Sequence, residues 1–258
     1  MSSSAIHPSH WETGACQHVD FISDLHLQAS HPKTARAFFD FLQQRQPAPL
    51  VVLGDLFEVW VGDDCLMAPA FEFERQCVKA LHQASVQSAM AWVCGNRDFL
   101  VGDDLHRAIG WTALHDPSVI RSPFGQCLIS HGDAWCLADS DYMAFRQKIR
   151  HAEWCQSFLA QSLSVREQQA RHMREQSQHN QTLRSVWADV DLTVACDQLA
   201  SHQCLHLVHG HTHHPQDQDL GRGMQRHVLS DWELDAPGPA RAEVLRWSKK
   251  GFERVTLT

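Results

Sequence analysis

Five short apolar runs, each followed closely by Asp, Asn or His, constrain the fold of this chain more than any other feature. Short continuous apolar segments bounded by glycine and polar residues are typical of strands that are covered on both faces. The pattern therefore predicts five buried strands, each with a polar cluster at its exit. The runs are HVDFI before Asp24, PLVVL before Asp55, AMAWVC before Asn96, QCLIS before His131 and CLHLV before His211.

Two segments between these runs have helical periodicity. Residues 33–44 (KTARAFFDFLQQ) and 71–84 (FEFERQCVKALHQA) place apolar residues three and four apart, as a helix that packs on a sheet requires. Strands that alternate with helices predict a layered α/β architecture. From RHVLSDWELD to ERVTLT the chain again has a strand pattern, which should complete the sheet.

The 258 residues, 43% of them hydrophobic, can fill one sizeable core. We expect residues 1–16, which are small and polar, to form a flexible N-terminal extension, and residues 17–258 to form one domain. The segment at about 139–192 has no strand signal, and its basic and acidic residues are close to balanced. It is predicted to be a helical insertion that stands over one end of the sheet as a lid. An ordinary solvated helical face is the alternative.

Composition argues against several classes of protein. The net charge of −8 disfavours a nucleic-acid binder, since such proteins usually present a basic surface. Nine cysteines, an odd number without a Cys-x-x-Cys pair, indicate reduced thiols in a cytoplasmic protein. The sequence has no signal-peptide pattern and no apolar run near the roughly 20 residues of a spanning helix, so we expect a soluble or peripheral protein. No protein partner is evident.

The polar clusters at the strand exits supply oxygen and imidazole donors. In layered α/β proteins these exits converge on one edge, where ligands bind. Two clusters use a one-residue gap, which on a regular strand places both side chains on the same face. The donors are Asp24, His26, Asp55, Asn96, His131, His211 and His213.

Seven donors exceed what one catalytic metal takes from protein, and they suit two divalent ions that share a bridging carboxylate. Two such ions bring four positive charges, of which Asp24 and Asp55 offset two. The remaining positive charge should attract phosphate oxygens and lower the pKa of bound water from about 15.7 towards 7. Oxygen and imidazole donors suit manganese, iron or zinc, and this pattern does not choose among them.

The order Asp-x-His, Gly-Asp, Gly-Asn, His-Gly and Gly-His-x-His resembles the motif set of the calcineurin-like metallophosphoesterases, from about residue 18 to the C-terminus. The resemblance implies a two-sheet β-sandwich flanked by helices, and in-line attack of metal-activated hydroxide on phosphorus. It also assigns the ligands. Those of the first metal are Asp24, His26, Asp55 and His213, and those of the second are Asp55, Asn96, His131 and His211, with Asp55 bridging.

Arg97 departs from the broader family, which usually has a histidine there that helps an alkoxide leaving group depart. Arginine cannot give up its proton, because its pKa lies above about 12. A phosphate that leaves from a pyrophosphate needs no proton, and Arg97 can hold its oxygens with a bidentate fork. A salt bridge to Asp98 or another neighbour is the structural alternative. We therefore expect the catalytic residues to be Asp24, His26, Asp55, Asn96, Arg97 and His131.

A narrower resemblance follows from the flanks GDLFEVWVGDD, GNRDFLVG, HGDAWCLAD, YMAFRQKIR and GHTHHP, which are similar to those of the UDP-2,3-diacylglucosamine hydrolase family. It implies hydrolysis of a lipid-linked UDP-sugar to UMP and 2,3-diacylglucosamine 1-phosphate in lipid A biosynthesis. It further implies two manganese ions, water attack on the α-phosphorus, and an insertion that takes the acyl chains and contacts the cytoplasmic face of the inner membrane. The implied substrate contacts are Asn96, Arg97, Asp139, Ser177, Asn180, Arg184 and His211.

Two other functions remain open. The first is a different dimetal phosphohydrolase, such as a nucleotide pyrophosphatase or a phosphodiesterase, which Arg97 and the insertion disfavour. The second is a metal-free binding scaffold on the same fold. Such a scaffold would be expected to have lost several of the seven donors, and all of them are present.

Overall fold

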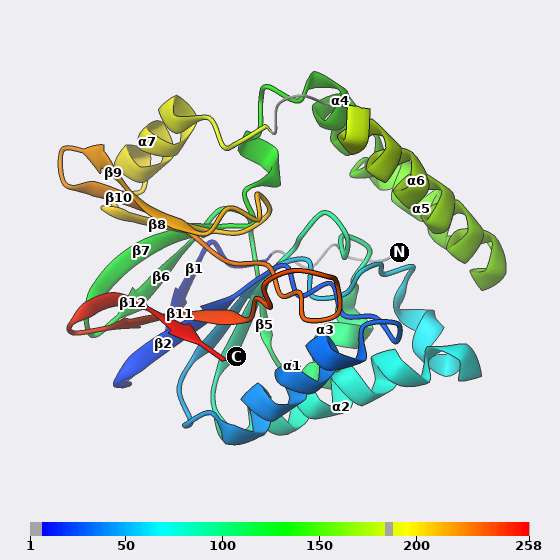
Figure 1. Ribbon diagram of the computed structural model, residues 1–258, viewed down its shortest axis with the longest axis horizontal. Coiled ribbons are helices and arrows are strands. Elements are labelled where there is room, and N and C mark those ends of the chain that lie inside the picture. Colours follow the sequence, from blue (N-terminus) through cyan, green and yellow to red (C-terminus); the bar gives the residue numbers. More distant parts are fainter. Residues whose placement is uncertain (1–6, 184–187, 258) are drawn as a thin grey trace.

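Two six-stranded mixed sheets pack face to face, and helices cover their outer faces (Figure 1). The computed structural model describes residues 7–183 and 188–257, and the side chains of these except for residues 177–183. In the order in which they pair, the strands of the first sheet are β12 (Gly251–Thr256), β11 (Glu243–Ser248), β2 (His18–Ile22), β3 (Leu50–Leu53), β4 (Met90–Val93) and β5 (Thr112–Leu114). Those of the second are β1 (His10–Glu12), β6 (Ser118–Ser122), β7 (Gly125–Ser130), β8 (His206–His209), β10 (Met224–Val228) and β9 (Gln216–Gly221).

The five predicted strands are confirmed as β2, β3, β4, β7 and β8, and the last two belong to the second sheet. Their apolar runs are continuous because both faces are buried. Val51 of β3 packs with Ile129 of β7 in the core between the sheets, whereas its neighbour Val52 faces the helices and shares a core with Phe38 and Leu81. The two-sheet sandwich implied by the resemblance is therefore present.

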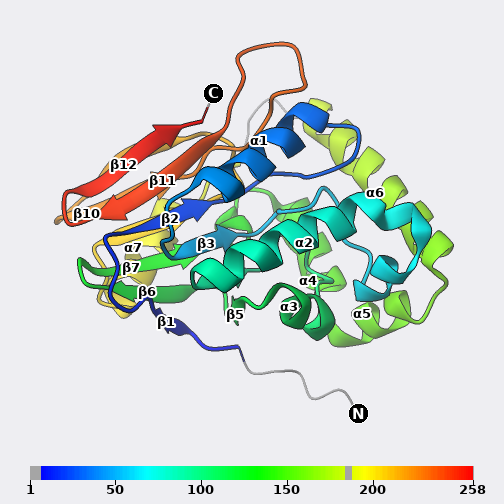
Figure 2. The ribbon, with the colours of Figure 1, turned by 90° about the horizontal axis from the view of Figure 1, so that it is seen from below.

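Helices α1 to α3 lie over the outer face of the first sheet (Figure 2). Both predicted helices are confirmed as α1 and α2. Helix α7 packs on the second sheet, where Ala195 and Leu199 meet Leu128 and Leu207. The helices are α1 (Pro32–Gln44), α2 (Glu72–Gln87), α3 (Asp103–Ile109), α4 (Ser140–Ile149), α5 (Ala152–Leu159), α6 (Leu163–Leu183) and α7 (Leu192–Ser201), with short 3-10 segments at Asp63–Met67, Pro69–Phe71 and Asp133–Trp135.

The N-terminal segment joins the sheet earlier than expected. Residues 1–16 were expected to be a flexible extension, but His10–Glu12 form β1 and pair in parallel with β6. Trp11 adds apolar surface to the edge of the inter-sheet core. A strand of three residues is too short to show an alternating pattern in the sequence, which is why the pairing was not foreseen.

The insertion at 139–192 contains α4, α5 and α6, which project together from one end of the sandwich (Figure 1). Two ion-pair clusters fasten it to the body of the protein. Buried Asp133 accepts hydrogen bonds from Tyr142 Oη at 2.7 Å and Arg146 Nε at 2.7 Å, both on α4. Buried Arg166 of α6 donates to Val61 O and forms an ion pair with Asp64.

Asp63 and Asp64, the acidic pair that follows WVG, have structural roles. Asp64 holds α6 through Arg166. Asp63 accepts hydrogen bonds from the backbone N–H groups of Gly102 and Leu105 at 3.0 and 2.9 Å, so it caps the start of α3. These two carboxylates fix the insertion and α3 to the same loop.

All nine cysteines are free thiols in this structure. Within residues 7–183 and 188–257, none of the helices combines the length and the apolar character that crossing a membrane requires.

Candidate metal centre

The loops after β2 and β3 run side by side and carry three of the predicted donors. The backbone N–H of Asp24 donates to Gly54 O at 3.2 Å, and that of His26 donates to Asp55 O at 3.0 Å. The bond from Leu27 N to Leu56 O, at 2.9 Å, continues this pairing. The side chains of these loops are thereby held at the same end of the first sheet.

Among the described residues, most of the non-glycine residues with a positive φ angle are predicted metal donors. Seven non-glycine residues have positive φ, and five of them are predicted donors. Such left-handed conformations cost of order 1–3 kcal/mol each and persist where the surroundings impose them, commonly at functional sites. The five are Asp24 (φ 53°), His26 (47°), Asp55 (51°), His211 (69°) and His213 (53°).

Two glycines allow the loops to approach so closely. A Cβ atom on Gly95 would lie 2.2 Å from Asp55 Oδ1, and one on Gly210 would lie 2.4 Å from Asp24 Oδ2. Real Cβ atoms do not come this near to other heavy atoms. The Gly-Asn and Gly-His motifs therefore require glycine for steric reasons.

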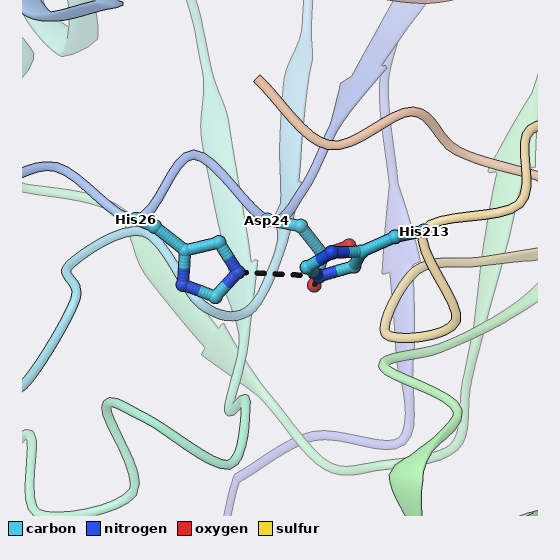
Figure 3. A group of neighbouring side chains, drawn as sticks. All are labelled: Asp24, His26 and His213. Carbon is cyan, nitrogen blue, oxygen red and sulfur yellow. Dashed lines mark hydrogen bonds and ion pairs between the residues drawn. The ribbon is translucent and has the colours of Figure 1, made fainter. Parts of the chain in front are cut away.

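Asp24, His26 and His213 form the first group of donors (Figure 3). The Nε2 atoms of the two histidines are 3.2 Å apart, and His213 Nε2 lies 3.5 Å from Asp24 Oδ1. Asp24 Oδ2 accepts hydrogen bonds from Ser23 Oγ and His211 N, at 2.5 and 2.8 Å. Asp24 Oδ1 is buried and has no hydrogen-bond donor in the described part of the chain. It faces His213 Nε2 at 3.5 Å and would contact a cation bound beside the two imidazoles.

The second group surrounds the side-chain oxygen of Asn96. That oxygen lies 2.9 Å from His131 Nε2 and 2.8 Å from His211 Nδ1. Because His131 Nδ1 donates to Leu53 O at 2.7 Å, its Nε2 is the atom that can bind a metal. Asp55 lies between the groups, with Oδ1 3.6 Å from His131 Nε2 and Oδ2 4.0 Å from His26 Nε2. The structure thus brings all seven predicted donors together.

The electrostatics of this site favour bound positive charge. Burial lowers the pKa of His131, but Asp55, Asp24 and Asp133 outweigh burial and raise it to about 9. Burial, followed by the charge of Asp55, raises the pKa of Asp98 to about 6. Closely spaced buried carboxylates are stabilised by cations, so this site would favour bound positive charge.

Arg97 is not engaged in the salt bridge that the sequence left open. Both oxygens of Asp98 accept backbone hydrogen bonds, from Leu56 N at 3.0 Å and Gly95 N at 2.8 Å. The Arg97 backbone N–H donates to Asp55 Oδ1 at 2.8 Å, and its Nε is buried without a hydrogen-bond partner among the described residues. Asp98 is therefore a structural partner of the loop rather than of Arg97, whose Nε has no hydrogen bond to any described residue.

Two residues of the site were missed by sequence reasoning. Tyr142, the single tyrosine of the chain, places its ring 5.7 Å from that of His211 and donates to Asp133. Asp133 also accepts from Arg146. Both lie in motifs that were recognised, HGDAWCLAD and YMAFRQKIR, but a local motif does not reveal that its members contact one another.

The structure describes only one of the predicted substrate contacts in the insertion with its side chain. Asp139 caps α4, accepting a hydrogen bond from Tyr142 N at 2.9 Å. Ser177 and Asn180 fall within α6, but their side chains lie outside what the structure describes, and Arg184 lies outside it altogether. Their roles stay predictions.

The fold and the donor set define a metal-dependent phosphoesterase. Residues 18–215 match the family model described as calcineurin-like phosphoesterase. The chain belongs to this family.

Within the family, the chain is similar to proteins named UDP-2,3-diacylglucosamine hydrolase from several bacteria. The relative from Cellvibrio japonicus is 40% identical over 223 residues, which cover 82% of this chain and 90% of the relative. The relative from Chromohalobacter salexigens is 38% identical over 230 residues, covering 86% and 92%. That from Bordetella pertussis is 35% identical over 241 residues, covering 91% and 93%.

Behind the Gly-His-x-His loop, His209 makes the stability of the protein depend on pH. Burial, reinforced by Arg226, lowers its pKa to about 3, and its Nε2 accepts a hydrogen bond from Arg226 Nε at 2.8 Å. The unfolded chain takes up this proton near pH 6.5, whereas the folded protein does not until about pH 3. The folded state is therefore destabilised as the pH falls from 6.5, by at most about 1.4 kcal/mol per pH unit.

We expect His209→Gln, which keeps a donor and an acceptor, to reduce this acid dependence. Urea unfolding of both proteins at pH 7, 6 and 5 measures it as the slope of unfolding free energy against pH. Equal slopes in variant and wild type would contradict the assignment.

Proposed function

We propose that this protein hydrolyses the pyrophosphate bond of UDP-2,3-diacylglucosamine to UMP and 2,3-diacylglucosamine 1-phosphate. The observation that carries the proposal is the pair of donor groups separated by the two oxygens of Asp55. The names of the relatives supply the substrate. The proposed site holds two divalent ions, manganese by family resemblance. The first would be held by Asp24, His26, Asp55 and His213, and the second by Asp55, Asn96, His131 and His211.

The residues present fit such ions. Asp24 Oδ1 is a buried carboxylate oxygen without a hydrogen bond in the described chain, and His131 presents Nε2 because its Nδ1 is already engaged. Oxygen and imidazole donors without thiolate suit manganese, iron or zinc, and the choice of manganese comes from the family resemblance alone. Bound ions would supply Lewis acidity, which polarises the phosphate and acidifies water.

The chain's own residues would orient the pyrophosphate and exclude bulk water. We propose that Arg97 binds phosphate oxygens through its planar guanidinium and stabilises the charge that develops on them. The leaving phosphate needs no proton, so an arginine serves where a histidine would be needed for an alkoxide. Asn96 and His211 would contact the same phosphate, and Asp139, Ser177, Asn180 and Arg184 the rest of the substrate.

The test is direct. Purified protein given Mn²⁺ and UDP-2,3-diacylglucosamine should release UMP, detected by chromatography, and excess chelator should stop the release. Asp55→Ala should abolish turnover because it removes the carboxylate between both donor groups, while Asp104→Ala on the exposed face of α3 should not.

Faster turnover of a nitrophenyl phosphodiester than of UDP-2,3-diacylglucosamine would favour the alternative of a phosphodiesterase. Activity that survives complete metal removal, or a protein that binds no metal, would reject the proposal.

Arg97→His tests the leaving-group argument. Because histidine cannot form a bidentate fork, kcat for pyrophosphate cleavage should fall by about a hundredfold. Metal content, measured by atomic absorption, should stay as in the wild type, since the Arg97 side chain is not among the donors. Unchanged kinetics would mean that Arg97 does not act on the phosphate.

We further propose that the insertion contacts the cytoplasmic face of the inner membrane, where an acylated substrate resides. Each helix of the insertion exposes a large apolar side chain: Phe145 is 41% exposed, Leu159 41% and Val165 39%. Apolar side chains on exposed helices contribute to peripheral membrane binding by burial at the headgroup boundary.

The combined variant Leu159→Ser and Val165→Ser should therefore co-sediment less with vesicles of phosphatidylethanolamine and phosphatidylglycerol. The matched control is Val86→Ser, an exposed apolar position on α2, away from the insertion. Equal binding of all three proteins would remove the support for this surface.

A further inference from the structure

Arg150 directly follows helix α4 of the insertion, and its side chain reaches the loops that carry the second donor group. Its backbone N–H donates to Arg146 O at 3.0 Å, which fixes it at the C-terminal end of α4. Its side chain is only 24% exposed. A guanidinium that is largely out of water is costly unless it has partners, so its contacts are informative.

Two of those contacts hold the chain directly after β4. Arg150 Nη2 donates to Gly95 O at 2.8 Å, and Nη1 donates to Cys94 Sγ at 3.1 Å. Gly95 directly precedes Asn96, whose side-chain oxygen faces the two histidines of the second donor group. The hydrogen bond to the Gly95 carbonyl therefore restricts the peptide unit from which Asn96 extends.

The third contact is with the loop after β7. Arg150 Nη2 lies 3.5 Å from Oδ2 of Asp133, a fully buried carboxylate two residues beyond His131. One guanidinium from the insertion thus lies between the segment before Asn96 and the segment after His131. None of these three contacts reaches the first donor group.

Arginine is suited to this position by its shape. The planar guanidinium presents its N–H groups in a fixed fork, so one side chain can hold several acceptors in set directions. Here the acceptors are a carbonyl, a thiol sulfur and a carboxylate. A lysine ammonium at the same place would keep the charge but not the fork.

We propose that Arg150 is a positioning residue that keeps Asn96 and His131 in place relative to each other, and thereby couples the second metal site to the seating of the insertion. The proposal rests on the proposed function, because it takes Asn96 and His131 as metal ligands. Arg150 acts on them through the backbone of Gly95 and through Asp133. Residues that orient metal ligands in this way contribute measurably to metal affinity.

Metal affinity is the first measurement. Mn²⁺ is titrated into the chelator-treated full-length protein, and the free ion is counted by electron paramagnetic resonance. The wild type should bind two ions. Arg150→Ala should weaken the binding of one ion by about tenfold, the lower end of what the loss of a supporting contact costs, and leave the other unchanged.

Two further variants control this result. Arg150→Lys should weaken the same ion less, because the ammonium keeps the charge beside Asp133 but cannot hold Gly95 O and Cys94 Sγ together. Lys148→Ala, which removes an exposed cation from α4, should bind both ions as the wild type does.

Hydrogen exchange of the α4 amides is the second measurement. Coupling between two sites is reciprocal, so a metal that is stabilised by Arg150 should in turn stabilise the seating of α4. Mn²⁺ should therefore slow exchange in α4 of the wild type and of Lys148→Ala, and Arg150→Ala should lose most of this slowing. Equal slowing by Mn²⁺ in all three proteins would reject the coupling.

The outcomes separate the two levels of the argument. A wild type that binds fewer than two Mn²⁺ ions overturns the proposed two-metal centre. A wild type that binds two, with Arg150→Ala folded by circular dichroism and binding both as tightly, overturns the role of Arg150 alone. Equal weakening of both ions also overturns it, because a general loss of structure would act on both. If Arg150→Ala does not fold, Arg150→Lys against Lys148→Ala decides by the same criteria.

Discussion

The close packing of buried carboxylates at the ends of the central strands is the constraint on which the rest of the structure depends. Asp24, Asp55, Asp98 and Asp133 are all buried. Ionised carboxylates out of water are costly without partners, and the raised pKa of His131, despite its burial, shows how strongly they act on a neighbour. Asp98 and Asp133 accept hydrogen bonds from the protein and support the site. Asp24 and Asp55 are the carboxylates among the predicted metal donors.

The supporting carboxylates are satisfied by the protein itself. Asp98 receives two backbone N–H groups, and Asp133 receives Tyr142 and Arg146 from the insertion. Asp24 Oδ1 has no hydrogen bond within the described residues. The insertion thus supplies cationic and hydroxyl partners to Asp133, while Asp24 Oδ1 in the first donor group receives none of these. This is the arrangement that a centre for external cations requires.

Local sequence patterns were sufficient to predict the strands and the donors at their ends. They were not sufficient to predict contacts between residues that lie far apart in the sequence. Strands buried on both faces have continuous apolar runs, so β2, β3, β4, β7 and β8 could be predicted, and with them the seven donors. Asp64 and Arg166, 102 residues apart, form an ion pair that no local pattern encodes. The three-residue β1 was missed because alternation needs a longer strand.

Under the proposed function, the surroundings of Arg97 explain how an acidic chain would bind a polyanionic substrate. Arg146 and Arg166 are each paired with a carboxylate, so their charge is largely offset locally. Asp98, the carboxylate adjacent to Arg97 in sequence, is saturated by backbone donors instead. The Nε atom of Arg97 has no hydrogen-bond partner among the described residues. Under the proposed function, Arg97 would therefore give a chain with a net charge of −8 a local point of attraction for a pyrophosphate, beside the ions that offset the buried carboxylates.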